Sequence, residues 1–344
     1  MAKRWYGVNL GNWLLVETWM KPSLVEGTKA GDEYTLAEAK GAEAPAFFDR
    51  HRDTFITEAD FQFLADWGIN AVRIPYGYWI IEPDGPYVGG IKYLDRALDW
   101  CGKYGIDAIL DLHGAPGYQS SAHHSGRADF YQWHLNPAYR KRSLEIIEAV
   151  AQRYARHPGL GAISLLNEPQ NDVPASILLE YYQAGYEVVR KYCPERVAVI
   201  MEAHQNPRLA QFHGKLKGTN IVTDTHYYHI FWQEQLRLEL NEHIAFPLTR
   251  LVPRFHDFNQ AGDMIVGEWS LSFGKTDQWA DMDEMHRFFA MRAFADAQLF
   301  AYSYTRGWFF WSYQVENAVA WSFKDAVRMG YLPAKLPQAL AKTE

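Results

Sequence analysis

The sequence predicts an α/β fold in which residues 1–344 form a single catalytic (β/α)8 TIM barrel. The first observation is that eight short apolar runs alternate with helical stretches, with neither an internal repeat nor a linker between them. The second is that two of these runs stop at a carboxylate. Residues 162–166 end just before Asn167 and Glu168, and a second run ends at Glu268. Because the carboxyl ends of barrel strands share one face, we expect the two glutamates to face each other.

The chain begins with a strand in residues 5–16 that leads into a glycine-containing turn, and Glu17 follows directly. Residues 21–52 are polar, rich in glycine and alanine and only weakly periodic, so we expect a loop excursion with one short helix. A helix should then cover residues 58–67, where apolar residues recur at three- and four-residue spacing. Thr57 precedes it as a plausible cap.

The next strand carries Arg73 within an apolar run and ends at Pro75, so this arginine should point into the barrel or towards its rim. The loop over residues 115–133 is long for a compact domain, and loops of that length are usually functional. Strands are predicted at 69–75, 106–112, 162–166, 197–201, 220–225, 264–268 and 307–312, and helices at 93–104, 136–156, 174–192 and 283–304, with further helical stretches in 236–261.

The composition excludes several classes of protein. A net charge of −7 with scattered basic residues argues against nucleic-acid binding, and no apolar run approaches the length of a membrane span. The 13 Trp, 21 Tyr and 19 Phe residues exceed what a core needs and suit the binding of sugars or bases. Cys101 and Cys193 are too isolated for a disulfide framework or a metal motif.

The first residues contain no apolar leader-like segment. We therefore expect a cytoplasmic protein, or a secreted one if a leader was removed before the first residue. The sequence leaves the oligomeric state open, with a monomer as the expectation.

The two strand-end glutamates suggest the cleavage of a glycosidic bond. That reaction needs one carboxyl that stays protonated and one that is ionised. If they stand about 5–5.5 Å apart, the ionised one can attack the anomeric carbon directly, with retention of configuration. Pro169 supports the placement of Glu168, because it pushes the residue before it out of the helical region. The alternative is that each glutamate forms a structural ion pair at its strand end.

Seven motifs occur in order from about residue 5 to about residue 331: GVNLGNWLLVE, VRIPYGYW, DLHGAPG, LLNEP, THYYHIF, GEWS and GWFFWSYQVENA. Together they resemble glycoside hydrolase family 5 of the large retaining barrel clan, and within it the exo-β-1,3-glucanase branch. The short NEP motif is a moderate signal by itself, whereas seven motifs in register are a strong one.

The resemblance implies that Glu168 is the acid/base and Glu268 the nucleophile. It also implies that Asn167 binds the sugar 2-hydroxyl and that Arg73 and Tyr228 hold the nucleophile. Further implied sugar contacts are His113 and His226 at two strand ends, Glu17 at the closed end of the pocket, Trp311 beneath the reacting sugar, and Phe231 as one half of an aromatic pair that grips the next sugar.

The sequence departs from this family pattern at the partner of Phe231, which should fall near Ala122, where no large ring exists. Tyr118 or His123 could substitute for it. Fungal members of the branch are also secreted and disulfide-bonded, whereas this sequence shows neither a leader-like segment nor cysteines suited to pairing. These differences point towards a shorter soluble substrate, such as an oligosaccharide or a glycoside with a non-sugar group. Adjacent histidines such as His123 and His124 do not easily face one metal ion, so we expect neither a metal nor a cofactor.

The sequence therefore predicts a metal-free retaining hydrolase that releases glucose from β-glucosides or β-1,3-gluco-oligosaccharides by double displacement. Alternatives with the same chemistry are a rutinoside-type diglycosidase, a glucosylceramidase and an endo-β-glucanase. A non-catalytic carbohydrate-binding barrel and a metal-dependent hydrolase are alternatives of a different class. The length of the loop at 115–133, and whether Glu17 blocks one end of the cleft, should decide between exo and endo action.

Overall fold

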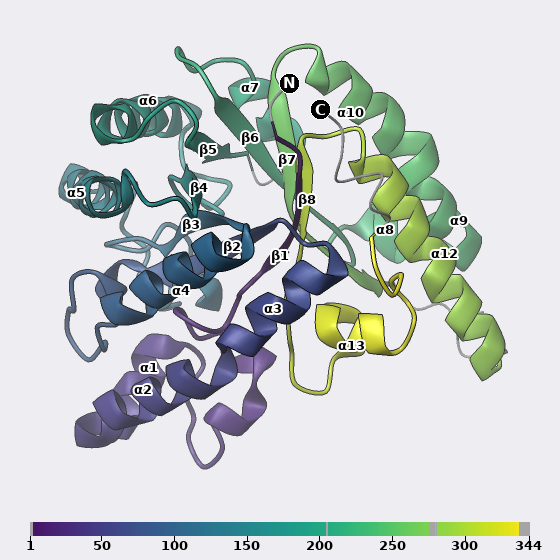
Figure 1. Cartoon of the computed structure of the whole chain (residues 1–344), viewed down its shortest axis with the longest axis horizontal. Coiled ribbons are helices and arrows are strands. Elements are labelled where there is room, and N and C mark those ends of the chain that lie inside the picture. The colour runs from purple at the N-terminus through teal and green to yellow at the C-terminus, as the bar shows by residue number, and fades with distance from the viewer. Residues whose placement is uncertain (1–2, 204–205, 275–278, 280, 337–344) are drawn as a thin grey trace.

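The computed structural model describes residues 3–203, 206–274, 279 and 281–336, and in it eight parallel strands close into a barrel (Figure 1). Each strand pairs with the next along the chain, and the last pairs with the first. The predicted fold class is therefore confirmed. The strands are β1 (Trp5–Asn9), β2 (Ala71–Gly77), β3 (Asp107–Gly114), β4 (Leu160–Ser164), β5 (Ala198–Glu202), β6 (Ile221–His229), β7 (Asp263–Phe273) and β8 (Gly307–Phe310).

Helices cover the outside of the barrel, as Figure 1 shows most clearly for α5, α6 and α12. Their number and order follow the strand–helix alternation that parallel strands require. The helices are α1 (Glu33–Lys40), α2 (Ala44–Phe55), α3 (Glu58–Trp67), α4 (Ile91–Tyr104), α5 (Pro137–Tyr154), α6 (Ala175–Tyr192), α7 (Asn206–Phe212), α8 (Gln233–Leu236), α9 (Leu240–Phe246), α10 (Val252–Asn259), α12 (Glu284–Tyr302) and α13 (Phe323–Arg328).

Local sequence signals explain where several helices begin and end. Thr57 forms a capping box with Asp60 at the start of α3, which confirms the predicted cap. Gly68 ends the same helix with φ 105°, a backbone conformation that residues other than glycine rarely adopt. Gly105 ends α4 in the same way, with φ 68°.

The interior of the barrel is filled by side chains. Small alanines alternate there with large rings, and the Trp5 and Phe309 ring centroids lie 6.3 Å apart. Gly7 makes room for this packing, because a Cβ atom there would lie 2.2 Å from the Phe309 ring. The inner cluster consists of Trp5, Ala71, Ile109, Ala162, Ala198, Ile200, Val222, Ile265 and Phe309.

Cys101 and Cys193 are both buried and free. Across the described ranges of the chain, no helix combines the length and the apolar character that a membrane crossing would need.

The sequence prediction was wrong for residues 21–52. Instead of one short helix, this excursion contains α1 and the start of α2. α1 buries only Glu33, Leu36 and Ala37, so its apolar periodicity is too weak to recognise in the sequence.

Several strand ends also differ from the prediction. β2 does not stop at Pro75 but continues to Gly77, and β6 and β7 run on to His229 and Phe273. These extensions carry polar and aromatic side chains towards the mouth of the barrel, and such side chains do not resemble a buried strand in the sequence.

A buried ion pair lies within the excursion, and its carboxylate also bonds to segments that follow β1 and β2. Arg52 on α2 lies 3.5 Å from the Glu33 carboxylate on α1, and both side chains are buried. Glu33 also accepts hydrogen bonds from the Val16 backbone N–H (2.6 Å) and the Trp79 indole (2.9 Å). Burial raises the pKa of Glu33, and the charge of Arg52 opposes that rise. This contact fixes the segment that leads directly into Glu17.

We predict that Arg52→Met lowers the free energy of unfolding by roughly 3–5 kcal/mol, because it leaves the buried Glu33 carboxylate without its cation. Urea denaturation at pH 7 measures this loss. The control is Lys141→Met, which breaks the exposed pair with Glu145 on α5 and should cost no more than about 0.5 kcal/mol. Equal losses in the two variants would contradict a structural role for the buried pair.

Candidate active site

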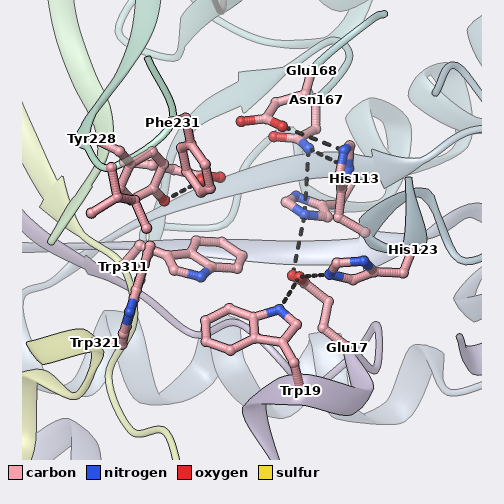
Figure 2. A pocket seen from close by; sticks show the side chains of 13 residues that line it. Glu17, Trp19, His113, His123, Asn167, Glu168, Tyr228, Phe231, Trp311 and Trp321 are labelled. Atoms are coloured by element: carbon pink, nitrogen blue, oxygen red, sulfur yellow. Dashed lines mark hydrogen bonds and ion pairs between the residues drawn. The ribbon is translucent and has the colours of Figure 1, made fainter. Parts of the chain in front are cut away.

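A cavity of about 350 Å³ opens at the carboxyl ends of the strands and contains both strand-end glutamates. This is the face on which barrel enzymes carry their sites. Figure 2 shows its walls, with Glu168 and Asn167 at one end and Glu17 and Trp19 at the other. The lining residues are Glu17, Trp19, His113, His123, His124, Asn167, Glu168, Tyr228, Ile230, Phe231, Glu268, Trp311 and Trp321.

Glu168 is held by its backbone just beyond β4. The Asn167 N–H donates to the Leu112 carbonyl at 3.0 Å, which continues the pairing towards β3. The Glu168 N–H donates to the Glu202 carboxylate at 2.6 Å. With φ 37°, Glu168 lies in the left-handed region, and Pro169 prevents the chain from continuing as a helix. A non-glycine residue there is a strained position that the surrounding bonds must maintain.

Glu268 lies on β7 and faces Glu168 across the cavity floor. One carboxylate oxygen of each residue, together with a nitrogen of His226, lies within 4.8 Å of the others. Glu268 accepts hydrogen bonds from Arg73 Nη1 at 2.9 Å and from the Tyr228 hydroxyl at 2.7 Å. The two glutamates are therefore brought together, with Glu268 fixed by two donors.

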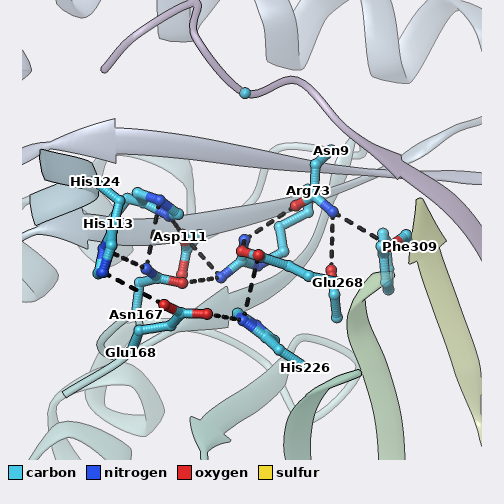
Figure 3. Close-up of polar contacts among 12 residues, drawn as sticks. Asn9, Arg73, Asp111, His113, His124, Asn167, Glu168, His226, Glu268 and Phe309 are labelled. Atoms are coloured by element: carbon cyan, nitrogen blue, oxygen red, sulfur yellow. Dashed lines mark hydrogen bonds and ion pairs between the residues drawn. The ribbon is translucent and has the colours of Figure 1, made fainter. Parts of the chain in front are cut away.

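Arg73 is a fully buried cation beneath the cavity (Figure 3). Besides Glu268 it contacts Asp111 at 3.1 Å, and it donates to the side-chain oxygens of Asn167 at 2.7 Å and Asn9 at 3.0 Å. Burial alone would lower the pKa of Arg73, but the carboxylates of Asp111 and Glu268 outweigh it and raise the pKa. One guanidinium thus orients both Asn167 and Glu268.

His226 lies behind the two glutamates. Its Nδ1 atom is 2.6 Å from a Glu168 oxygen and 3.3 Å from a Glu268 oxygen, while Nε2 faces Glu202 at 3.5 Å. Burial alone would lower the pKa of His226, but the carboxylates of Glu202 and Glu268 hold it well above its ordinary value. The ring therefore acts as a second buried cation between the carboxylates.

The pKa of Glu268 is set by opposing effects. Burial raises it above the ordinary value for a glutamate, the positive charges of His226 and Arg73 lower it, and the neighbouring Glu168 raises it again. The net direction is upward, so Glu268 ionises at a higher pH than an exposed glutamate and depends on its cationic and hydrogen-bonding partners to do so.

His113 and Trp311 form a flat wall of the cavity. Their rings are stacked, with centroids 5.5 Å apart and an interplanar angle of 9°. The His113 Nδ1 atom is 2.7 Å from Asp111, which fixes the ring orientation, and Nε2 lies 3.4 Å from the Asn167 amide nitrogen. The peptide bond between Trp311 and Ser312 is cis.

A second cavity of about 450 Å³ shares Glu168, His124 and Phe231 with the first, and Phe231 is 65% exposed. Ala122 lines this cavity, so the aromatic partner expected opposite Phe231 is absent. Tyr118 cannot replace it, because its side chain is buried with its hydroxyl 3.0 Å from that of Tyr87. Of the two suggested substitutes, only His123 lines the cavities.

Several residues of the site were missed by sequence reasoning. His124 lies 3.4 Å from Glu168, and burial lowers the pKa of its ring to about 4, so it is neutral. Trp19 and Trp321 pack edge to face at 5.4 Å and form another wall. Asp111 and Glu202 ended apolar runs in the sequence and could have been found by that signal, whereas nothing local distinguishes Trp321.

Glu168, His226 and Glu268 offer ligand atoms close enough to hold a metal ion. The contacts of these three side chains with their neighbours explain in another way why they lie so close together. His226 has a raised pKa, and its protonated ring has no lone pair to offer a metal. Glu268 is also already bonded to Arg73 and Tyr228. The cluster is therefore a pair of carboxylates neutralised by side-chain cations.

Comparison with known proteins agrees with a glycoside-cleaving site. Residues 31–317 match the family model described as Cellulase (glycosyl hydrolase family 5). The fold and the match define the protein as an O-glycosyl hydrolase. More narrowly, the chain belongs to glycosyl hydrolase family 5, which confirms the family resemblance of its motifs.

Two named relatives cover nearly the whole chain. It is 34% identical to a probable glucan 1,3-beta-glucosidase A of Aspergillus clavatus, over 95% of this chain and 86% of the relative. It is 32% identical to a glucan 1,3-beta-glucosidase of Blumeria graminis, over 96% and 87%.

Solved structures share the fold at lower sequence identity. Rutinosidase from Aspergillus niger superposes with a TM-score of 0.79 at 21% identity, covering 96% of this chain and 98% of that one. An endoglucanase from Thermotoga maritima gives 0.56 at 15% identity, covering 94% and 93%. At these identities, the similarity to the two solved structures shows a shared barrel fold.

We predict that Tyr228→Phe moves the acidic limb of the kcat/KM profile to higher pH by about one unit, because Glu268 loses a donor that favours its ionised form. The retaining reaction expected from the sequence uses ionised Glu268, so activity should fall as the pH drops through this raised pKa. The control is Tyr93→Phe, which removes a 2.9 Å tyrosine–carboxylate bond to Asp49 outside the site. An unchanged acidic limb in Tyr228→Phe would show that the hydroxyl does not tune Glu268.

Proposed function

We propose that this protein is a retaining β-glucosidase of the exo-β-1,3-glucanase type, which removes glucose from the end of β-linked substrates. The observation that carries the proposal is the approach of Glu168 and Glu268 to within 4.8 Å inside one sugar-sized cavity. Retaining enzymes hold their carboxyl groups about 5–5.5 Å apart, whereas inverting enzymes need about 6.5–9.5 Å to place a water between them.

In the first step a Glu268 oxygen attacks the anomeric carbon and the bond to the leaving oxygen breaks. Arg73 and Tyr228 aim the Glu268 carboxylate, because each binds one of its two oxygens. Glu168 gives its proton to the departing oxygen, and a glycosyl ester on Glu268 results. In the second step Glu168 takes a proton from water, the water attacks the same carbon, and Glu268 leaves as a carboxylate.

Neighbouring side chains would stabilise the charge that develops on the sugar. Arg73 binds the Asn167 oxygen, which leaves the Asn167 amide nitrogen turned towards His113 and His124 at the cavity wall, and there it can donate to the 2-hydroxyl. A bond to the 2-hydroxyl strengthens in the transition state. Trp311 and His113 offer the sugar a flat, apolar face.

The geometry favours release of single sugars from a chain end. Glu17 lines the first cavity but not the second, and its side chain is packed against Trp19 and His123. The terminal sugar would occupy the first cavity, with Glu168 at its exit. The remainder of the substrate would extend into the second cavity past Phe231.

The substrate class follows from relatives and from the second cavity. The named relatives are glucan 1,3-beta-glucosidases, and the rutinosidase neighbour suggests a second candidate, cleavage of a disaccharide from a non-sugar group. Ala122 removes one side of the expected aromatic grip, while Phe231 and the half-exposed Trp232 remain. A short oligosaccharide or a glycoside with a flat apolar group fits this arrangement.

We predict that Glu268→Ala lowers kcat on an aryl β-glucoside by at least about 10⁴-fold, and that azide restores turnover with an α-glucosyl azide as product. Azide takes the place of the missing carboxylate, so a single displacement inverts the anomeric carbon. NMR of the product reports its configuration. Loss of activity without rescue, or a product of retained configuration, would contradict the role of Glu268.

The comparison variant is Glu168→Ala, in which Glu268 still forms the ester. Azide should then give the β-product, and the loss of kcat should be roughly 10²–10⁴-fold larger for poor leaving groups than for activated aryl glucosides. Equal losses on both types of substrate would remove Glu168 from the acid/base role.

We predict that laminari-oligosaccharides yield glucose alone, released from one end, because Glu17 closes the first cavity. Chromatography of early products from laminari-, gentio-, cello- and sophoro-oligosaccharides identifies both the linkage and the mode. Rutinosides provide the competing substrate: release of intact rutinose would favour the second candidate. Internal cleavage into mixed fragments would indicate an endo-glucanase.

A further inference from the structure

At the end of the first cavity away from Glu168, the Glu17 carboxylate is surrounded by ring nitrogens. The Glu17 side chain is buried, and one of its oxygens accepts from Trp19 Nε1 at 2.9 Å and lies 3.3 Å from His123 Nε2. Its other oxygen lies 3.8 Å from His113 Nε2. In Figure 2 the rings of Trp19 and His123 both point at the Glu17 carboxylate, from different sides of it.

The backbone around His123 is well fixed although it belongs to the long loop. Ser125 donates through its hydroxyl to the carbonyl oxygens of Ser120 and Ala122, at 2.9 and 2.8 Å. Gly126, with φ 97°, closes the short turn that carries His123. The His123 side chain nevertheless remains 43% exposed, so it is open to a molecule that enters the cavity.

His123 and Glu17 each favour the charged form of the other. The hydrogen bond and charge of Glu17 raise the pKa of His123, with smaller contributions from Asp32 and Glu168. Burial would raise the pKa of Glu17, but His123, His113 and His124 outweigh it and leave that pKa lowered. A cationic donor and a carboxylate acceptor thus stand side by side in the pocket.

A sugar hydroxyl has one donor and two acceptor positions, so it can bind both groups at once. We propose that His123 is a specificity-determining residue that donates a hydrogen bond to a free hydroxyl at the far end of the terminal sugar, while that hydroxyl donates to Glu17. The candidates are the hydroxyl opposite the anomeric carbon, at C4, and its neighbour at C6. This inference rests on the proposed glucosidase function and assigns a substrate contact to a residue of the loop.

The pair selects for neutral sugars with that hydroxyl present. A substrate without the hydroxyl leaves the two charged groups without the partner they would bind, and sites built around a hydroxyl reject the analogue that lacks it. The charge of Glu17 offsets that of His123, so the pair offers no net positive charge to an anionic group at the same position.

A cycle of substrates and variants tests the direct contact. The kcat/KM of wild type, His123→Ala and His286→Ala is measured on an aryl β-glucoside and on its 4-deoxy and 6-deoxy analogues. In wild type, kcat/KM for one of the two deoxy analogues should be at least about tenfold lower than for the parent glucoside. In His123→Ala, kcat/KM for the parent glucoside should fall by a similar factor relative to wild type. Within this variant, removing the hydroxyl should then lower kcat/KM by less than about a further threefold. His286 pairs with Asp283 at 2.8 Å on the surface, so His286→Ala should match wild type.

The inference would be overturned if, for both deoxy analogues, the loss from His123→Ala and the loss from removing the hydroxyl multiply. The hydroxyl and His123 would then act independently. If wild type hydrolyses no β-glucoside at all, the proposed function itself fails and the inference fails with it. An active wild type with multiplying losses removes only the role of His123.

His123→Gln separates binding from a merely structural role, because glutamine keeps a donor but does not titrate. In wild type, KM should rise as pH increases through the raised pKa of His123, where the ion pair is lost, while kcat stays level over the same interval. His123→Gln should recover most of the parent activity relative to His123→Ala and show no such rise in KM. A fall in Tm with equal losses in both variants would indicate that His123 only supports the loop.

Discussion

The site depends on the compensation of buried carboxylates by buried cations. Asp111 and Glu268 both contact the guanidinium of Arg73, and Glu168 and Glu268 both contact the ring of His226. Each charge would be costly to bury alone, because a low-dielectric interior disfavours an unpaired ion. The network therefore holds the two glutamates at short range despite the repulsion between their like charges.

The same compensation gives the two glutamates different surroundings. Glu268 is bound by Arg73 and Tyr228, two donors that favour its ionised form. Glu168 lies between the protonated ring of His226 and the neutral ring of His124, at the boundary of the two cavities. Distinct environments for two like groups are what an acid/base and a nucleophile require.

Segments outside the barrel decide what the site can hold. The excursion, anchored by the Arg52–Glu33 pair, positions the chain that carries Glu17. The loop before α5 supplies His123 and His124 opposite it, and the segment after β8 contributes Trp321. Glu268 lies on β7 and Glu168 just beyond β4, whereas the Glu17 end of the cavity and its walls come from connecting segments. Loop variation on a constant barrel is how this fold changes its substrates.

The sequence by itself determined the barrel, the family and the strand-end residues. Apolar runs that stop at Glu168 and Glu268, and a charge within the run around Arg73, are local patterns that follow from strand burial. The tertiary structure alone decided the partners that lie far apart in the chain: the contact of His123 with Glu17, the wall formed by Trp321, and the exclusion of Tyr118 from the cavity. Loop conformations depend on long-range contacts rather than on local periodicity, so no pattern within the loop could reveal them.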